Sequence, residues 1–287
     1  DSSESLKIAV IESQSTPPQW LPDKFDNRVS ALTEASRQIL SHLGAWDEIE
    51  QTRISPYQNM HVWDADGVGK VNFCAADIQQ PVLGHIVENN LIVSALTHQA
   101  QQHPQIELLY GSGVAQLSPF KNNIRTIELE SGELLSAKLV IAADGALSTV
   151  RTLAEMELKE KPYHHNAIVT TVKTEKEHGL TAWQRFDETG PLAFLPLSKE
   201  QEGSSQRDNH YSSIVWSVTP EKSAELMALD ETQFRQALGA AIEFRLGEVL
   251  EAEPRFHFPL IQRHAQQYVL PGLALMVTQP IPFIRWQ

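Results

Sequence analysis

The sequence is organised around residues 139–151, LVIAADGALSTVR. Its first five residues form an apolar run bounded by a glycine turn, which predicts a strand buried on both faces. This strand should end at Asp144-Gly145, and a helix should follow with Ser148 as its N-cap and Arg151 in its first turn. A carboxylate at the carboxyl end of a strand lies where open α/β sheets bind ligands. Asp-Gly is equally typical of a plain turn and serine of a plain helix cap, so these residues alone leave both interpretations open.

Length, charge and cysteine content limit the classes of protein to consider. The 287 residues suffice for one large domain or two modest ones, and the formal net charge is −13. An acidic chain argues against a nucleic-acid partner, because phosphate binding needs a basic face. The single cysteine, Cys74, excludes an internal disulfide framework and fits a reducing compartment, so we expect a cytoplasmic protein. No apolar run approaches the ~20 residues that span a bilayer, so we expect no transmembrane span.

Residues 6–12, LKIAVIE, predict a buried strand that ends on Glu12. In a dinucleotide-binding βαβ unit such an acid binds the adenosine ribose and follows a glycine-rich turn by roughly 20 residues. Only eleven residues precede Glu12, and none of them is glycine. From this strand alone, a simple strand-terminal acid is the favoured interpretation.

The rest of the first half alternates helices and strands, whereas the second half is dominated by strands. Residues 59–74 predict a hairpin, and residues 84–104 predict a short strand that runs into an amphipathic helix. A strand over 134–143 precedes the Asp-Gly turn. In the second half, successive strands joined by polar turns predict one antiparallel sheet, and two amphipathic helices follow. The expected strands lie at residues 167–174, 182–187, 192–197, 211–218 and 255–260, with the helices within 220–247.

No self-sufficient catalytic constellation is present in the sequence. It contains no GxSxG, HExxH, CxxC or Walker motif, and its eleven histidines are scattered without the spacing of a metal site. This absence favours either a binding module or an enzyme whose chemistry belongs to a cofactor.

The order of several motifs resembles a known family. RVSAL from Arg28, LGHIVEN, VIAADGALSTVR, GPLAFLPL and FPL follow one another over residues 6–276. This pattern is similar to the FAD-dependent aromatic hydroxylases related to para-hydroxybenzoate hydroxylase, and most of all to the ubiquinone-biosynthesis polyprenylphenol hydroxylases. The resemblance implies a mixed α/β (α+β) fold, in which a Rossmann-like FAD-binding layer is interleaved with an antiparallel-sheet substrate domain.

The resemblance also implies domain boundaries. Residues 1–60 and 84–160 would form the FAD-binding layer, which lacks the GxGxxG strand and turn, and residues 61–83 would be a sheet excursion from it. Residues 161–265 would form the antiparallel substrate domain with its two helices. Residues 266–287 would contain a return strand and a tail that looks out of frame.

Roles for individual residues follow from the resemblance alone. Glu12 would bind the adenosine ribose of FAD, and Arg28, opening a helix, would lie along the flavin and pyrophosphate. Val87, Glu88 and Asn89 would pass near the ribityl chain. Asp144 and Gly145 match the family's DG motif, which Arg151 completes. No side chain would carry the oxygen chemistry, and no metal is implied. Residues proposed to line the substrate pocket, for each of which core packing is the alternative, are Phe194, Pro196, Trp216 and Pro259.

The implied activity is that of an FAD-dependent monooxygenase. The flavin C4a-hydroperoxide would transfer a hydroxyl group to the ring of a polyprenylated ubiquinone precursor, with O₂ as co-substrate and NAD(P)H or another electron donor as reductant. The lipid-tailed substrate implies peripheral contact with the inner membrane, and other quinone-biosynthesis proteins are candidate partners. Two alternatives stay open: a hydroxylase of a soluble aromatic acid, and a non-catalytic interaction subunit of a quinone-biosynthesis complex.

Two departures from the family pattern concern the ends of the chain. The GxGxxG segment, whose glycines bring backbone and a helix N-terminus to the pyrophosphate, does not precede Glu12. After Met276 the tail VTQPIPFIRWQ replaces a Gly-Asp motif of the type GDAAHTIHPLAG. Codons compatible with Met276 to Gln287, read from the third base of the Met codon, spell Gly-Asp-Ala-Ala-His-Thr-Ile-His-Pro-Leu-Ala. We therefore hypothesise a truncated and frameshifted hydroxylase that cannot hold FAD tightly, which the source nucleotide sequence tests directly.

Overall fold

A computed structural model describes residues 6–200 and 207–276, so the predictions for the first five residues and for the tail after Met276 lie outside the described residues. The chain divides into two compact units. Unit 1 contains Asp1–Pro17, Ala100–Tyr163 and Leu260–Gln287, and unit 2 contains Pro18–Gln99 and His164–Pro259. Each unit is described by itself.

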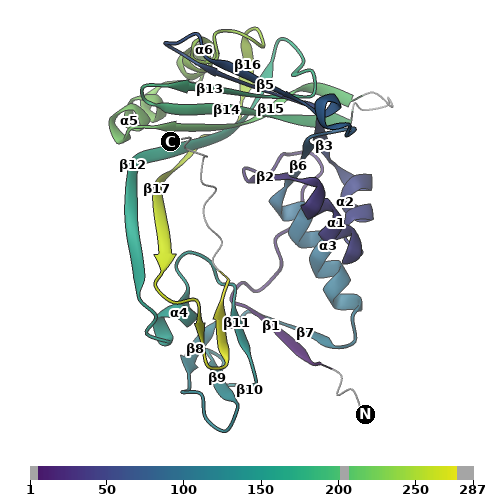
Figure 1. Cartoon of the computed structure of the whole chain (residues 1–287), viewed down its shortest axis with the longest axis vertical. Helices are drawn as coiled ribbons and strands as arrows, with labels where there is room; N and C mark the ends of the chain where they lie inside the picture. The colour runs from purple at the N-terminus through teal and green to yellow at the C-terminus, as the bar shows by residue number, and fades with distance from the viewer. Residues whose placement is uncertain (1–5, 201–206, 277–287) are drawn as a thin grey trace. The chain divides into compact units, whose positions relative to one another are not determined.

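The described residues of unit 1 form three small sheets (Figure 1). In one, β1 and β7 pair in parallel; in another, β8, β9 and β10 form an antiparallel meander; in the third, β11 pairs in parallel with β19, which pairs with β18. The elements are β1 (Ile8–Glu12), β7 (Ile106–Tyr110), β8 (Val114–Leu117), β9 (Arg125–Leu129), β10 (Leu134–Ala137), β11 (Val140–Ala142), α4 (Thr149–Leu153), β18 (Val269–Leu270) and β19 (Leu273–Leu275).

The strand expected over 134–143 is in fact two strands. Residues 134–137 pair with β9, whereas residues 140–142 pair with β19, so the chain changes sheet between them. The expectation that this run is buried on both faces is also wrong. Ala142 is buried in the unit 1 core, but the side chain of Ile141 is 56% exposed. The reason is that, among the described residues, the core lies against one face of β11, and Ile141 points to the other.

Unit 2 holds most of a large sheet with the strand order β16-β12-β15-β14-β13-β4-β5 and with β17 paired to β12; residues 158–163 of β12 and 260–265 of β17 belong to unit 1. Strands β12 to β15 pair in antiparallel fashion, as predicted, and the predicted 59–74 hairpin joins the same sheet through a parallel contact between β4 and β13. These elements are β4 (Asn59–Asp64), β5 (Lys70–Cys74), β12 (Leu158–Thr174), β13 (Thr181–Asp187), β14 (Gly190–Glu200), β15 (Arg207–Val218), β16 (Val249–Ala252) and β17 (Phe256–Ala265).

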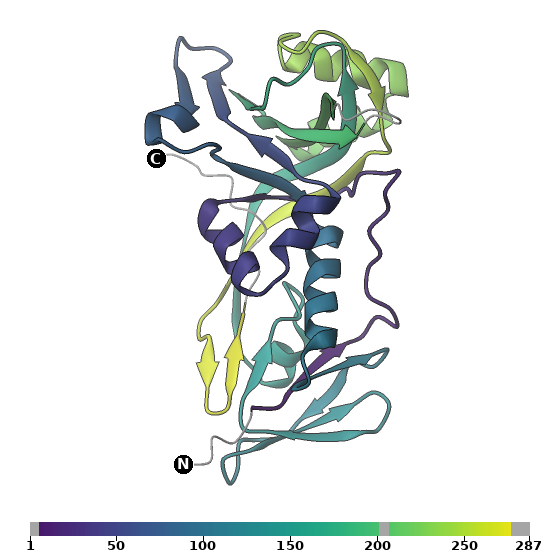
Figure 2. The same cartoon turned by 90° about the vertical axis from the view of Figure 1, so that its right-hand side faces the viewer.

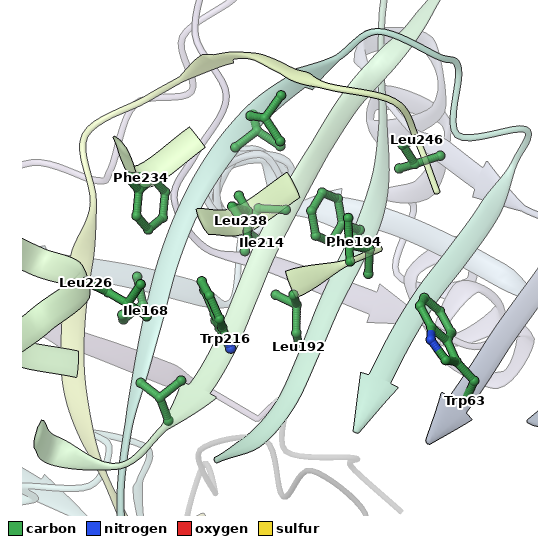
Figure 3. Close-up of a cluster of buried hydrophobic side chains, with 14 residues drawn as sticks. Trp63, Ile168, Leu192, Phe194, Ile214, Trp216, Leu226, Phe234, Leu238 and Leu246 are labelled. Atoms are coloured by element: carbon green, nitrogen blue, oxygen red, sulfur yellow. The ribbon is translucent and has the colours of Figure 1, made fainter. Parts of the chain in front are cut away.

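Two amphipathic helices, α5 (Pro220–Ala228) and α6 (Glu231–Ala241), cover one face of this sheet. Alternate residues of the strands, such as Phe194 and Trp216, pack against Leu226, Phe234 and Leu238 from the helices (Figure 3). Each helix begins at a side-chain cap, which accepts a hydrogen bond from the first turn and so fixes where the helix starts. This cluster is the main hydrophobic core of the described residues.

A smaller antiparallel sheet, β2-β6-β3, packs against three helices in the same unit; α3 stands beside the short α1 and α2 in Figure 2. The predicted step from a short strand into a helix at residues 84–104 is confirmed by β6 and α3. The elements are β2 (Val29–Leu32), α1 (Glu34–His42), α2 (Trp46–Thr52), β3 (Ser55–Tyr57), the 3₁₀ turn η1 (Ala75–Ile78), β6 (Gly84–Glu88) and α3 (Asn89–Gln102).

The helix expected to open at Arg28 begins six residues later. Residues 29–32 form strand β2, which pairs with β6, and Thr33 caps α1 by accepting a hydrogen bond from the Ser36 amide at 3.3 Å. The expectation was wrong because β-branched and apolar residues before Thr33 pair with a neighbouring strand, a contact that local spacing does not reveal.

The mixed α/β fold class is confirmed, with several sheets and helices in both halves of the chain. Among the described residues, none of the helices has the length and apolar character required to cross a membrane.

Candidate functional site

The residues expected to contact FAD fall in both units. Unit 1 holds Glu12, Asp144, Gly145 and Arg151, whereas unit 2 holds Arg28, Val87, Glu88 and Asn89.

In unit 1, the DG segment forms a tight strand-to-helix turn. Ser148 caps α4, as predicted, by accepting a hydrogen bond from the Arg151 amide at 2.9 Å. The Asp144 carboxylate accepts a further hydrogen bond from the Val150 amide at 3.1 Å, so it also satisfies a backbone amide in the first turn of the helix. Gly145 has a φ of +82°, a left-handed conformation that favours glycine. The two interpretations of Asp-Gly are thus compatible, since the turn itself places a carboxylate at the end of β11.

A shallow pocket lies beside this turn, lined by Ala142, Gly145, Ala146, Ser148, Arg151, Leu158, Arg263, Leu275 and Met276. The Arg151 guanidinium donates to the Ala146 carbonyl at 3.0 Å through Nη1. Arg263 pairs with Glu160 at 2.6 Å. Both guanidinium groups that line the pocket are therefore already engaged by protein acceptors.

Glu12 stands at the carboxyl end of β1, as predicted, but the expectation that this strand is buried is wrong, because Ile8 and Val10 are exposed among the described residues. Its Oε1 accepts bonds from the Gln14 amide at 2.9 Å and from the Ser13 hydroxyl at 3.3 Å. Its Oε2 has no hydrogen-bond partner among the residues that the structure describes. A partly exposed carboxylate with one oxygen oriented and the other open is suited to accept hydrogen bonds from a sugar diol.

In unit 2, Glu88 is committed to protein contacts. Its side chain is 3% exposed and forms a bidentate ion pair with Arg53, whose Nε and Nη2 lie 2.6 and 2.8 Å from the two carboxylate oxygens. The Trp20 indole and the Asp26 amide donate to the same carboxylate at 3.2 and 2.7 Å. Val87 lies in the helix-covered core. The Glu88 carboxylate is therefore occupied by hydrogen bonds from Arg53, Trp20 and Asp26.

Arg28 is placed differently, because its backbone is fixed while its side chain is exposed. Asp26 accepts a bond from the Arg28 amide at 3.1 Å, and the Arg28 carbonyl accepts one from the Asn89 amide at 2.9 Å. The Asn89 side chain accepts a bond from the Ser30 hydroxyl at 2.7 Å. In the described part of the chain, the Arg28 guanidinium forms no hydrogen bond or ion pair. It can bind an anion without breaking an existing interaction.

The residues proposed to line a substrate pocket have contrasting positions. Phe194 and Trp216 lie in the core beneath α5 and α6, and Pro196 is also buried, whereas Pro259 is exposed. The Trp216 indole nitrogen is buried without a hydrogen-bond partner in the described structure. Contact of these four residues with a substrate stays a prediction.

Comparison with known proteins identifies the family. A family model described as FAD binding domain matches residues 11–273, which is most of the chain. The chain belongs to this family. Among the residues predicted to bind FAD, Glu12 has an open acceptor and Arg28 an uncommitted guanidinium, which suits them to the hydroxyl and anionic groups of the cofactor; their contact with FAD stays a prediction.

Two relatives are similar over most of this chain. The 3-demethoxyubiquinol 3-hydroxylase of Escherichia coli strain K12 is 34% identical over 269 residues, covering 94% of this chain and 66% of that protein. The mitochondrial ubiquinone biosynthesis monooxygenase COQ6 of Xenopus tropicalis is 38% identical over 245 residues, covering 82% of this chain and 50% of that protein. The chain thus spans between half and just under two thirds of these relatives.

Solved structures share the fold at low sequence identity. PqsL of P. aeruginosa, in complex with 2-aminobenzoylacetate, superposes with a TM-score of 0.73 at 17% identity, covering 94% of this chain and 71% of that one. The p-nitrophenol 4-monooxygenase PnpA of Pseudomonas putida DLL-E4 gives a TM-score of 0.67 at 16% identity, covering 94% and 66%. These matches establish the shared fold.

Proposed function

We propose that this protein works as an FAD-dependent monooxygenase that hydroxylates the aromatic ring of a polyprenylated ubiquinone precursor. The observation that carries the proposal is the 34% identity to a 3-demethoxyubiquinol 3-hydroxylase along 94% of the chain. The similarity to a relative named ubiquinone biosynthesis monooxygenase supports a role in ubiquinone biosynthesis. O₂ is the co-substrate, and NAD(P)H or another electron donor is the reductant. The lipid tail of the substrate calls for peripheral contact with a membrane.

The chain's own residues would bind and orient the cofactor, which when bound supplies the oxygen-activating chemistry. The Glu12 carboxylate would accept hydrogen bonds from the ribose hydroxyls, with its orientation set by the Gln14 amide. The Arg28 guanidinium would bind an anionic part of FAD. The turn at Asp144 and Gly145, with Arg151, would hold a further part of the cofactor. Val87, Glu88 and Asn89 would support the ribityl region chiefly through the backbone and the contacts of their neighbours.

Binding and turnover can be tested in succession. The purified chain is titrated with FAD while flavin fluorescence is followed, and we expect quenching that saturates only at high FAD concentration, in keeping with the hypothesis that this chain does not hold FAD tightly. Glu12→Gln should weaken binding, whereas Glu107→Gln, on the paired strand β7 and exposed, should not. The chain loaded with FAD is then given NADH or NADPH and a polyprenylated phenol, and products are identified by mass spectrometry. Hydroxylation of soluble aromatic acids alone, or no flavin uptake, contradicts the proposal.

A further inference from the structure

The segment 20–28 contains no helix or strand, yet side chains from outside it fix it at several points. It leads into β2 and ends on Arg28, whose guanidinium is uncommitted. We propose that Arg53, at the end of α2, is a positioning residue for FAD that clamps this segment and thereby sets the place of Arg28. The inference rests on the proposed function, because it assigns Arg28 to the cofactor.

The Arg53 guanidinium donates hydrogen bonds both to the segment 20–28 and to Glu88 at the end of strand β6. Nη1 donates to the Pro22 carbonyl at 2.7 Å, and Nη2 donates to the Lys24 carbonyl at 2.8 Å and to the Leu21 carbonyl at 3.3 Å. Nε and Nη2 form the bidentate pair with Glu88. Only a planar fork of donors can serve three carbonyl groups and a carboxylate at the same time, so lysine is not an equivalent residue.

Aromatic rings of the segment enclose this guanidinium. Its central carbon lies 4.8 Å from the centroid of the Trp20 ring and 4.5 Å from that of the Phe25 ring. The Arg53 side chain is accordingly only 8% exposed. Cation–π contacts gain strength when the cation is desolvated, so the two rings and the guanidinium stabilise one another. The segment is thereby folded around Arg53.

The clamp reaches Arg28 through Asp26. The Asp26 amide donates to Glu88 at 2.7 Å, while its carboxylate accepts bonds from the amides of Arg28 and Asn90 at 3.1 and 3.0 Å. Arg53, Glu88 and Asp26 therefore form one continuous network that ends at the Arg28 backbone. Preorganised backbone with an unpaired side chain is the arrangement expected of a ligand-binding residue.

The experiment compares Arg53→Lys with a matched arginine elsewhere in unit 2. Arg255 donates to the carbonyls of Leu226 and Leu229 and stacks 4.6 Å from the Phe234 ring, so Arg255→Lys removes similar contacts far along the chain. A milder variant, Phe25→Leu, removes one stacking ring and keeps the ion pair. Circular dichroism establishes folding for each variant.

Two readouts then follow: the rate of trypsin cleavage after Lys24, and the dissociation constant for FAD with the visible spectrum of the bound flavin. Arg53→Lys should raise the cleavage rate and raise the FAD dissociation constant about tenfold, the lower end of the effect on metal affinity when a group that orients a metal ligand is removed. Phe25→Leu should shift both readouts less. Arg255→Lys should change neither, although it lowers the melting temperature.

Unchanged cleavage in Arg53→Lys, or faster cleavage with an unchanged FAD dissociation constant and spectrum, overturns the inference. Failure of the proposed function gives a different result, because the unsubstituted chain then takes up no FAD. In that case the cleavage rates alone decide whether Arg53 clamps the segment.

Discussion

His178 should make the stability of this protein fall as the pH drops below neutral. The side chain is almost fully buried, and both ring nitrogens are engaged: Nε2 faces the Leu197 carbonyl at 3.1 Å, and Nδ1 accepts from the Leu180 amide at 3.1 Å. This arrangement fits the neutral ring, because protonated Nδ1 would face a donor. Burial lowers the pKa of His178 from 6.5 to about 4.

The sign of the effect follows from proton linkage. Between pH 6.5 and 4 the unfolded chain binds a proton at His178 that the folded protein does not, so protonation favours unfolding. The free energy of unfolding should therefore fall by about 3 kcal/mol across this window, since each pKa unit corresponds to about 1.4 kcal/mol. Below pH 4 the loss from this residue is complete.

Urea unfolding at a series of pH values, followed by tryptophan fluorescence, measures this loss. Trp183 is a local probe, since its indole donates to the His178 carbonyl at 3.3 Å. His178→Asn keeps an acceptor near Nδ1 but loses the bond to Leu197, which should cost about 1–2 kcal/mol at pH 7. It lacks the titration, so the stability curves of variant and wild type should cross near pH 5; His103→Asn, at an exposed site, is the matched control. Parallel curves for His178→Asn and wild type would refute the reasoning.

Three further substitutions test the packing. Glu88→Gln keeps the shape but leaves the buried Arg53 charge unpaired, and urea unfolding should show a loss of about 3 kcal/mol. Phe234→Ala empties a fully buried core position and should lower the free energy of unfolding by about 3–5 kcal/mol. Its control is Ile141→Ala, at a residue that is more than half exposed, which should lower the free energy of unfolding by less than about 1 kcal/mol. Equal melting temperatures for the two variants would contradict the core assignment. A β-carbon at Gly84 would lie 2.5 Å from the Leu32 carbonyl oxygen of β2, so Gly84→Ala should lower the free energy of unfolding by about 1–3 kcal/mol. An unchanged urea midpoint would mean that β2 and β6 move apart at no cost in stability.

Elements whose signal is local were predictable from the sequence. The hairpin of β4 and β5, the step from β6 into α3, and the Ser148 cap each depend on neighbours a few residues apart, and the structure confirms them. The strand at 29–32 was missed because it is stabilised by β6, more than fifty residues away in the chain. Local pattern carries no information about such a partner.

Which face of a strand is covered was not predictable either. Alternation shows that Phe194 and Leu192 share a face of β14, but not that α5 and α6 lie on that face. In the same way, an apolar run such as that of β11 predicts burial on both faces, although only one face of it packs against the core. Burial is a property of the neighbouring elements, and these are set by topology.

Arg53 had no distinguishing signal in the sequence. An arginine after the last turn of an amphipathic helix is typical of a solvated helix end, and its partner Glu88 is 35 positions away. A buried ion pair becomes visible only when the fold brings its members together. Sequence similarity to the family likewise suggested Glu88 as a cofactor residue without showing that its carboxylate is already bound.

The residues proposed to bind FAD therefore divide by what their side chains do in the protein itself. Glu88, Asn89 and Asp144 each hold neighbouring chain in place, so their substitution should lower stability whether or not FAD is present. Glu12 and Arg28 have hydrogen-bonding groups left open by the described residues. Substitution of Arg28, and Glu12→Gln, which keeps an oxygen to accept from the Gln14 amide, should therefore change affinity with little effect on unfolding. Stability and affinity thus report on different members of the same proposed site, and a variant that changes both, as Arg53→Lys should, marks a residue that connects the fold to the cofactor.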